Sequence, residues 1–171
     1  LAFLILYVVM LINSIGFILL AKQKADHKLF MAATYDSMTG IYNRSAFIEK
    51  ATSQINFHAR KGLPISLLLI DFDHFKKIND TYGHQIGDGV LKEFVQTIKS
   101  QLRSYDLFGR FGGEEFVVFL PETDREDAEE VSERLRHTTE LQPFIFDGNA
   151  ISYTISIGAV SLIPDQDTAI D

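Results

Sequence analysis

The sequence predicts an α+β fold, an α/β sandwich with a largely antiparallel sheet, preceded by one transmembrane helix. Three observations support this prediction. Residues 1–21 carry no charge, residues 65–72 form an apolar run of strand length, and a Gly-Gly pair separates strand-like segments over 106–111 and 115–120. Hairpin strands mixed with helices are typical of an antiparallel sheet that helices cover.

The composition excludes several classes of protein. The 171 residues include 23 acidic and 16 basic side chains, which gives a net charge of −7, and no cysteine. A disulfide scaffold, a thiolate zinc site and a cysteine nucleophile are therefore excluded. The acidic balance argues against a nucleic-acid partner, which would require a basic surface. The apolar content of 46% is sufficient for a packed core.

Residues 1–21 are predicted to cross a membrane. At ~1.5 Å per residue, a helix of this length spans about 30 Å, the thickness of the hydrocarbon core. A secretory signal peptide is less favoured because the segment has no basic start, and a buried core helix is the other alternative. The missing initial Met suggests an excerpt from a longer protein.

Residues 22–35 are predicted to form a cytoplasmic helical linker. Lys22, Lys24 and Lys28 follow the apolar segment directly, and the positive-inside rule places such a flank in the cytoplasm. The apolar positions of this segment fit two alternatives equally well, a stalk that pairs with a second copy and a solvated linker helix.

The elements of the remaining chain follow from apolar periodicity. The run over 65–72 suits a strand that is buried on both faces. Residues 151–162 alternate between polar and apolar side chains, as a half-buried strand does. Helices are predicted over 45–60, 74–79, 87–103 and 124–140, and a further short strand over 143–146.

Carboxylates follow the buried run directly. Strand alternation puts Asp71 and Asp73 on one face, with Phe72 on the opposite face. A carboxylate pair at a sheet edge can hold Mg²⁺, which prefers oxygen ligands and keeps waters and substrate phosphates. The alternative for Asp73 is that it caps the following helix, and this is the interpretation we favour for that residue.

The Gly-Gly turn is the second cluster of candidate functional residues. Gly112 and Gly113 permit positive φ and leave room for a ligand against the backbone. Glu114 and Glu115 follow, and a bound cation would relieve the repulsion between adjacent carboxylates. The alternative is an exposed hairpin with a solvated charge pair.

The third cluster lies between residues 79 and 88. The amide of Asn79 and the carboxylate of Asp88 offer the donors and acceptors that match a guanine edge. The alternative is turn chemistry with Asp88 as a helix N-cap. By itself, His84 is more typical of a structural residue than of a catalytic one.

Together these clusters resemble the GGDEF family of diguanylate cyclases. The resemblance covers about residues 36–163, and Met38 and Ile41 stand where leucine is usual. The motifs that carry it are DSMTGIYNR at 36–44, DFDHFKKINDTYGHQIGD at 71–88 and GGEEF at 112–116.

The resemblance implies a fold, an activity and a location. Residues 36–171 would form a nucleotidyl-cyclase palm, a sheet flanked by helices. Two GTP molecules would be joined into cyclic di-GMP with release of two pyrophosphates, and because each domain holds one GTP, the active form would be a homodimer. The expected location is the inner membrane of a bacterium, with the catalytic domain in the cytoplasm.

The resemblance also implies roles for single residues. Asp71, the Phe72 carbonyl and Glu114 would hold two Mg²⁺ ions, or Mn²⁺ in their place. Glu115 or Glu114 would help to deprotonate the ribose 3′-hydroxyl, and Lys76 would bind phosphate and stabilise the transition state. The backbone N–H groups of residues 73–76 suit phosphate binding.

The resemblance further implies which residues recognise the nucleotide. Asn79 and Asp88 would read guanine, with His84 near the ribose or base. The pattern Arg103-x-x-Asp106 matches the family's product-inhibition site, and Arg134 is a candidate second arginine of that site. The alternative for Arg103 and Asp106 is a surface salt bridge between side chains three residues apart.

The pattern breaks near the end of the sequence. The family normally continues beyond residue 163 with a helix bearing A-L-Y-x-A-K-x-x-G-R-N, so the domain is expected to be incomplete here and this chain weakly active or inactive. Two rival functions remain, a catalytically silent sensor that binds cyclic di-GMP and a dimerising output domain. The intact Gly-Gly-Glu-Glu-Phe sequence favours the enzyme.

Overall fold

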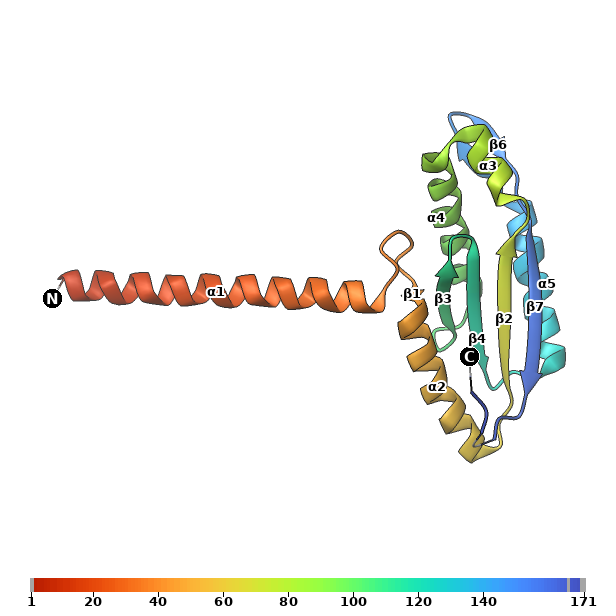
Figure 1. Cartoon of the computed structure of the whole chain (residues 1–171), viewed down its shortest axis with the longest axis horizontal. Coiled ribbons are helices and arrows are strands. Elements are labelled where there is room, and N and C mark those ends of the chain that lie inside the picture. The colour runs from red at the N-terminus through yellow and green to blue at the C-terminus, as the bar shows by residue number, and fades with distance from the viewer. Residues whose placement is uncertain (1, 166, 170–171) are drawn as a thin grey trace. The chain divides into compact units, whose positions relative to one another are not determined.

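The computed structural model describes residues 2–165 and 167–169, without the side chains of residues 2, 4–6, 8, 9, 11 and 12. The chain divides into two units, Leu1–Thr34 and Tyr35–Asp171. The first unit contains one helix, and the second contains the sheet with its covering helices (Figure 1).

The first unit is the helix α1, Ala2–Thr34. Residues 22–34, part of the predicted linker, continue the same helix. Within the described residues, no helix combines the length and the hydropathy that crossing a membrane requires. The predicted transmembrane helix over residues 1–21 is therefore not supported, and part of that segment lies outside the described residues.

The second unit is built on a five-stranded sheet with the order β1-β3-β4-β2-β7. Among the strand pairs of the described residues, only that of β1 with β3 is parallel, so the expectation of a largely antiparallel sheet is confirmed. A separate hairpin pairs β5 with β6. The strands are β1 (Tyr42–Asn43), β2 (Ile65–Phe72), β3 (Leu107–Gly112), β4 (Glu115–Pro121), β5 (Phe144–Phe146), β6 (Asn149–Ile151) and β7 (Ile155–Leu162).

Four helices accompany the sheet: α2 (Arg44–Lys61), α3 (Phe75–Tyr82), α4 (His84–Gln101) and α5 (Arg125–Leu141). Helix α2 packs on one face, against β1, β3 and β4. Helices α4 and α5 cover the opposite face, and α3 packs on α4. The second unit is therefore a layered sandwich of helices and sheet, as the sequence predicts.

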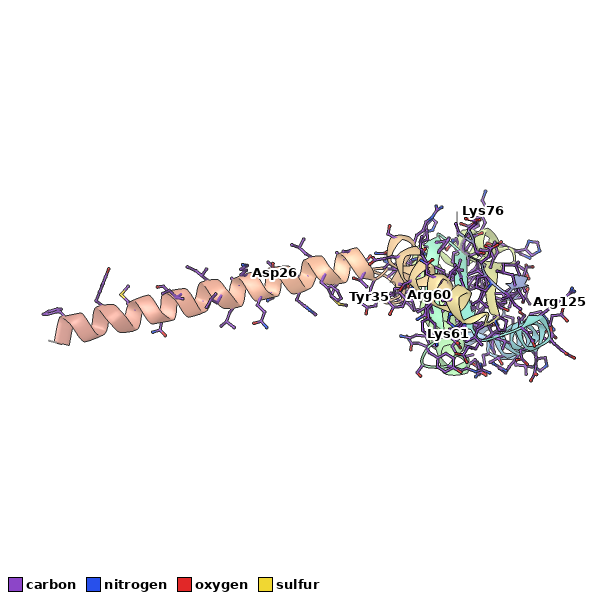
Figure 2. The ribbon with its side chains drawn as sticks, turned by 90° about the horizontal axis from the view of Figure 1, so that it is seen from below. Asp26, Tyr35, Arg60, Lys61, Lys76 and Arg125 are labelled. Carbon is purple, nitrogen blue, oxygen red and sulfur yellow. The ribbon has the colours of Figure 1, made fainter. Side chains whose placement is uncertain are left out.

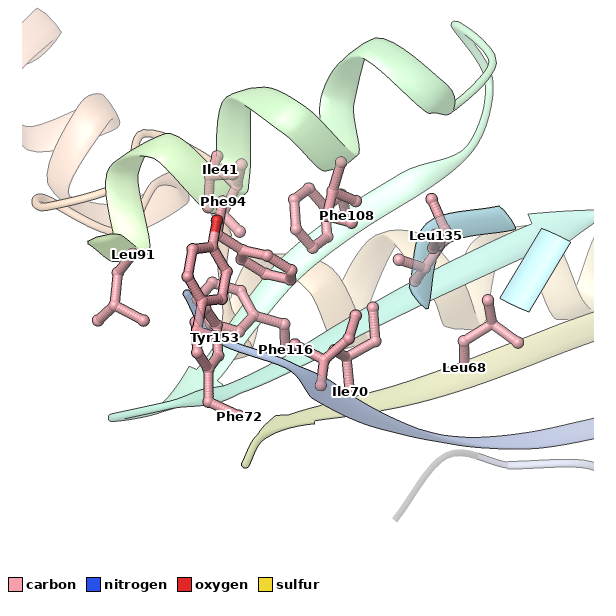
Figure 3. Packing of buried hydrophobic residues seen from close by; sticks show 14 of the residues in the cluster. Ile41, Leu68, Ile70, Phe72, Leu91, Phe94, Phe108, Phe116, Leu135 and Tyr153 are labelled. Atoms are coloured by element: carbon pink, nitrogen blue, oxygen red, sulfur yellow. The ribbon is translucent and has the colours of Figure 1, made fainter. Parts of the chain in front are cut away.

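The larger core lies between the sheet and the helices α4 and α5. Phe72 at the end of β2 is its centre, because its ring contacts those of Phe75, Phe94, Phe116 and Tyr153 (Figure 3). Ring centroids in these pairs lie between 4.7 and 6.0 Å apart, the range in which offset and edge-to-face contacts stabilise a core. The strand that carries Asp71 is thus anchored by the residue directly after it.

The smaller core lies under α2, and a glycine permits it. A Cβ atom on Gly109 of β3 would lie 2.7 Å from the Phe47 ring and 2.9 Å from its Cβ, so α2 rests directly on the strand backbone. Farther along the same face, beyond the buried Ile65 of β2, several apolar side chains of β2 and β7 are not covered. Leu69, Val160 and Leu162 are exposed there.

Several details differ from the sequence prediction. The short strands β1 and β6 were not expected, and the predicted strand over 151–162 is interrupted at residues 152–154, whereas the short strand predicted over 143–146 is observed as β5. Helix α4 begins at His84, three residues earlier than predicted, because Gly83 adopts a φ of 85° that reverses the chain between α3 and α4.

We expect Phe94→Ala to lower the free energy of unfolding by about 3–5 kcal/mol, because it leaves a cavity in the aromatic core. Urea denaturation of the wild-type and variant proteins measures this change. Phe57→Ala on α2 is the matched control: its side chain is 44% exposed, so its effect should be below about 1 kcal/mol. Equal losses in the two variants would contradict this view of the core.

Candidate active site at the end of the central strands

Two carboxylates face each other at the end of the central strands. In the antiparallel pairing of β2 with β4, Asp71 lies directly opposite Glu115, and both residues are exposed. On the other side of β2, Asp71 is opposite Ser156 of β7. Side chains directly opposite on adjacent strands share one face, and like charges in this position destabilise a sheet. The register therefore creates a site of concentrated negative charge.

The Gly-Gly turn completes this end of the sheet. Gly113 and Glu114 form the connection between β3 and β4, and Glu114 is half-buried. The two glycines permit a positive φ, but neither Gly112 nor Gly113 adopts one. Their role is space: a Cβ on Gly112 would lie 2.8 Å from the Glu115 Oε2, and a Cβ on Gly113 would point into open space.

The residues fit a metal that is shared with a ligand. Within the described part of the chain, no group of three or more His, Cys, Asp or Glu side chains could hold a metal ion. Asp71 and Glu115 supply two opposed carboxylates, Glu114 lies in the adjoining turn, and Phe72 adds a backbone carbonyl next to Asp71. Mg²⁺ usually binds one or two carboxylates and completes its shell with substrate phosphates and waters.

Asp73 anchors the turn that leads into α3. Its carboxylate accepts hydrogen bonds from Thr154 Oγ1 at 2.6 Å and Ser156 Oγ at 2.7 Å, and its N–H donates to the Thr154 carbonyl. The bonds from Ser156 and Thr154 hold the pKa of Asp73 below its usual value. Our interpretation of Asp73 as a helix cap is wrong, because the N-cap position of α3 is occupied by His74, in the left-handed region with φ 57°.

The first turn of α3 places a cation beside this anchored turn. Lys76 is exposed on α3, and Figure 2 shows it at the surface of the domain. Phe75, its neighbour, is buried against Phe72 and fixes the start of the helix. The ammonium group therefore extends from a rigid backbone into solvent.

The junction of α3 and α4 brings the proposed guanine-reading residues together. The side chain of Asn79 lies against the backbone of Gly87, where a Cβ would collide with Asn79 Oδ1. Asp88 is the next residue, exposed in α4 and beyond its first turn. Asp88 is therefore no N-cap, because α4 begins at His84. His84 is also exposed at this junction.

A second polar cluster lies before β3. The Arg103 N–H donates to Asp106 Oδ2 at 2.7 Å, while the Arg103 guanidinium lies 5.9 Å from the Tyr105 ring centroid. Arg134 of α5 reaches the Gln101 carbonyl at 3.5 Å. The alternative of a surface salt bridge between the side chains of Arg103 and Asp106 is not observed in the described structure.

Asp106 keeps one oxygen for a further partner. Its Oδ1 is buried and has no hydrogen-bond partner among the described residues. Burial raises the pKa of the Asp106 carboxyl, against the Arg103 N–H bond and the charges of Arg103 and Arg134. Three of the predicted residues are thus brought into one cluster with unused hydrogen-bonding capacity.

Sequence reasoning missed residues that hold the site in place. Arg110 on β3 donates to the Gly113 carbonyl and to Asp36, and nothing in our sequence analysis singled it out. Thr154 and Ser156 were noted only for their alternating polarity. The signal that could have found Arg110 is a cation directly before a Phe-Gly-Gly turn in an acidic neighbourhood.

The chain has clear relatives. The family described as "Diguanylate cyclase, GGDEF domain" matches residues 33–171. This chain belongs to the GGDEF diguanylate cyclase family. The response regulator PleD of Caulobacter vibrioides is 43% identical over 149 residues, which are 86% of this chain and 33% of PleD. The chain thus spans about a third of the length of that relative.

Solved structures of GGDEF proteins share the fold. The diguanylate cyclase SiaD of Pseudomonas aeruginosa, in complex with its activator SiaC, has a TM-score of 0.74 and 35% identity, covering 92% of this chain and 62% of SiaD. The GGDEF domain of DgcB from Caulobacter crescentus, in complex with c-di-GMP, has a TM-score of 0.72 and 29% identity, covering 77% of each chain.

We expect Glu115→Gln to raise the melting temperature in EDTA, because it removes the repulsion between Glu115 and Asp71. The expected gain in the free energy of unfolding is about 0.2–1 kcal/mol, the typical contribution of a cross-strand side-chain pair. The same variant should lose most of the stabilisation that added Mg²⁺ gives the wild type. Thermal unfolding with EDTA and with Mg²⁺ measures both effects.

The matched control for this prediction is Glu130→Gln, at an exposed position of α5. It should change neither the melting temperature in EDTA nor the response to Mg²⁺ relative to the wild type. A wild-type and a Glu115→Gln protein with the same response to Mg²⁺ would contradict a contribution of the Glu115 charge to cation binding at this end of the sheet.

We expect Asp73→Asn to remove a pH-dependent part of the stability. Because the folded-state pKa of Asp73 lies below the ordinary 3.8, the ionised carboxylate stabilises the fold above that value and loses this effect as the pH falls through the folded pKa. The difference in free energy of unfolding between wild type and variant should therefore be largest above about pH 5 and shrink toward about pH 3.

Urea unfolding at several pH values measures this difference. The double variant Thr154→Ala, Ser156→Ala removes both hydroxyl donors and should show the same loss of pH dependence. A difference that stays constant from neutral to acidic pH would show that the two hydrogen bonds do not favour the ionised carboxylate.

Proposed function

We propose that this domain condenses two GTP molecules into cyclic di-GMP and releases two pyrophosphates. The observation that carries the proposal is the register pair of Asp71 and Glu115, which concentrates negative charge next to the anchored turn before α3. A carboxylate pair beside exposed backbone and a lysine is the arrangement that phosphoryl transfer requires, since that reaction depends on positioning and charge stabilisation.

The reaction forms one bond and breaks one bond at each phosphorus. The 3′-hydroxyl oxygen of one GTP attacks the α-phosphorus of the other, and the bond from that phosphorus to the β-phosphate oxygen breaks, so pyrophosphate leaves. Glu115 or Glu114 accepts the hydroxyl proton, and Lys76 offsets the negative charge that develops on the phosphate. The second half-reaction repeats these changes with the roles of the nucleotides exchanged.

Asp71, Glu114 and the Phe72 carbonyl are the residues that we propose to hold two Mg²⁺ ions, and Mn²⁺ has the same oxygen preference. When bound, such ions lower the pKa of a coordinated hydroxyl and neutralise phosphate charge. The chain's own contribution is to hold the carboxylates at fixed positions, because Asp71 lies at the end of β2, which pairs with a strand on each side, and Phe72 packs in the aromatic core.

Guanine recognition is assigned to Asn79 and Asp88. The amide of Asn79 can accept and donate, whereas the carboxylate of Asp88 accepts from the ring N–H and the exocyclic amine of guanine. Adenine presents no such pair of donors. His84, exposed at the start of α4, lies at the same junction and is proposed to contact the ribose or the base.

The remaining features of the proposal concern assembly and location. One domain binds one GTP, so two domains must face each other, and a homodimer is proposed as the active form. The catalytic domain is proposed to work in the cytoplasm of a bacterium, where GTP is available. Attachment to the inner membrane stays a prediction from the sequence.

The cluster of Arg103, Asp106 and Arg134 is proposed to bind the product. Arginine guanidinium groups match phosphate oxygens and the guanine edge, and the unpartnered Asp106 Oδ1 can accept from guanine. The same observation supports the second candidate function, a silent sensor that binds cyclic di-GMP without making it. The two functions differ in whether Glu114 and Glu115 are needed.

We expect the domain, tested on a chain that includes the family's A-L-Y-x-A-K-x-x-G-R-N helix and incubated with GTP and Mg²⁺, to yield cyclic di-GMP and pyrophosphate in a mass spectrum. Glu114→Gln and Glu115→Gln should each lower the rate at least about 100-fold, because proton transfer and charge stabilisation depend on them. Both variants should still bind cyclic di-GMP in calorimetry, whereas Arg103→Ala should weaken that binding and leave synthesis intact. A folded, dimeric protein that binds cyclic di-GMP and leaves GTP unchanged would contradict the cyclase and establish the sensor.

A further inference from the structure

The turn that carries Glu114 and Glu115 has few restraints of its own. Gly112 and Gly113 have no side chains, and the strand register shifts between Arg110 and Gly112, so the ladder is irregular just before the turn. A bulge of this kind redirects the chain and leaves backbone groups without ladder partners. The direction of the two glutamates therefore depends on contacts from outside the turn.

Arg110 supplies such a contact. Its Nε and Nη2 both donate to the Gly113 carbonyl, at 3.2 and 2.6 Å, and its Nη1 donates to Asp36 Oδ1 at 3.1 Å. The guanidinium lies 5.9 Å from the Phe116 ring centroid, and only 11% of the side chain is exposed. A planar fork with several donors is required to reach both acceptors at once, and lysine has no equivalent.

The far end of this contact is also fixed. Asp36 Oδ1 accepts from the Thr39 N–H at 2.9 Å and from Thr39 Oγ1 at 2.6 Å, while its backbone bonds to Gly40 and Ile41 close the loop. Burial alone would raise the pKa of Asp36, but the bonds from Thr39 and Arg110 outweigh it and keep the pKa below its usual value. The carboxylate is thus a rigid anion that holds Arg110 in place.

We propose that Arg110 is a positioning residue, which holds the Gly113 carbonyl against the Asp36 loop and thereby directs Glu114 and Glu115. Arg110 touches no reacting atom in this proposal. It acts through the Gly113–Glu114 peptide, because rotation of that peptide would turn the Glu114 side chain and the start of β4. The inference rests on the proposed cyclase only for its catalytic consequence; the restraint on the turn is independent of it.

The experiment compares Arg110→Ala, Arg110→Lys and Asp36→Asn with the control Arg136→Ala. Arg136 also makes bonds to two carboxylates, Glu133 at 2.7 Å and Glu140 at 2.9 Å, but on the outer surface of α5. Hydrogen–deuterium exchange of the amides over residues 112–116, without nucleotide, is the first readout. The three test variants should raise this exchange about tenfold or more, and the control should leave it unchanged.

The second readout is the kinetics of cyclic di-GMP synthesis by the same proteins. We expect kcat to fall at least about tenfold in the test variants, with KM for GTP within about threefold of wild type, because a misdirected carboxylate impairs chemistry more than binding. Exchange at 112–116 within about twofold of wild type in folded Arg110→Lys and Asp36→Asn proteins would overturn the proposal. So would a rise in KM with unchanged kcat.

The two readouts separate this inference from the proposed function. A wild-type protein that makes no cyclic di-GMP, together with increased exchange in the test variants, would overturn the cyclase and support the positioning role of Arg110. If Arg110→Ala does not fold, the Lys and Asn variants decide the outcome, because both retain most of the side-chain volume at their positions.

Discussion

The antiparallel register between β2 and β4 is the constraint on which the candidate site depends. It sets Asp71 opposite Glu115, and a slip of one residue would send one of the two side chains to the other face of the sheet. The buried hydrophobic core fixes this register, because Ile70 and Phe116 are paired one position earlier and both are fully buried. Burial of these apolar side chains therefore keeps the Asp71 and Glu115 carboxylates close together despite their repulsion.

The helices around this end of the sheet hold two separate parts of the proposed binding site. The turn before α3 is bound to β7 through Asp73, so any group that its backbone N–H groups hold has a fixed position relative to Asp71. The junction of α3 and α4 is held by the close contact of Asn79 with Gly87. A nucleotide would contact the turn before α3 with its phosphates and the α3–α4 junction with its base. The distance between these two parts would therefore determine which ligand length fits.

Much of the fold could be predicted from the sequence because it rests on local patterns. The strand over 65–72 is confirmed in its bounds, because a continuous apolar run after a Gly-Leu-Pro stop is typical of a strand. The expected burial on both faces is wrong, because Leu69 is 52% exposed on the face that α2 leaves open. The short strands β1 and β6 could not be predicted, because two- and three-residue strands are defined by their partners and not by their own composition. The break at 152–154 is likewise imposed by tertiary contact, as Tyr153 turns into the aromatic core.

Some features of the candidate site could also be predicted from local sequence, whereas others depend on residues far apart in the chain. The position of Asp71 at a strand end and the small residues of the turn are sequence features, and the register pair with Glu115 follows once the hairpin is formed. Thr154 and Ser156 lie 81 and 83 residues from Asp73, and Asp36 lies 74 residues from Arg110, and no local pattern specifies such bonds. The Arg103 guanidinium lies over the Tyr105 ring. Asp106 is also near in sequence, and sequence spacing alone does not decide between these two partners.

Because Gly109 and Phe47 are in close contact, the side-chain volumes that the two positions can accept depend on each other. A methyl group at 109 would have to displace a Phe47 atom close to the α2 backbone, which cannot rotate away as the end of a long side chain can. Substitutions at the two sites should therefore be accepted together more readily than singly: a larger residue in the strand requires a smaller one in the helix. The pair sets the thickness of the layer between α2 and the sheet, and any engineered graft of this helix would have to carry both residues.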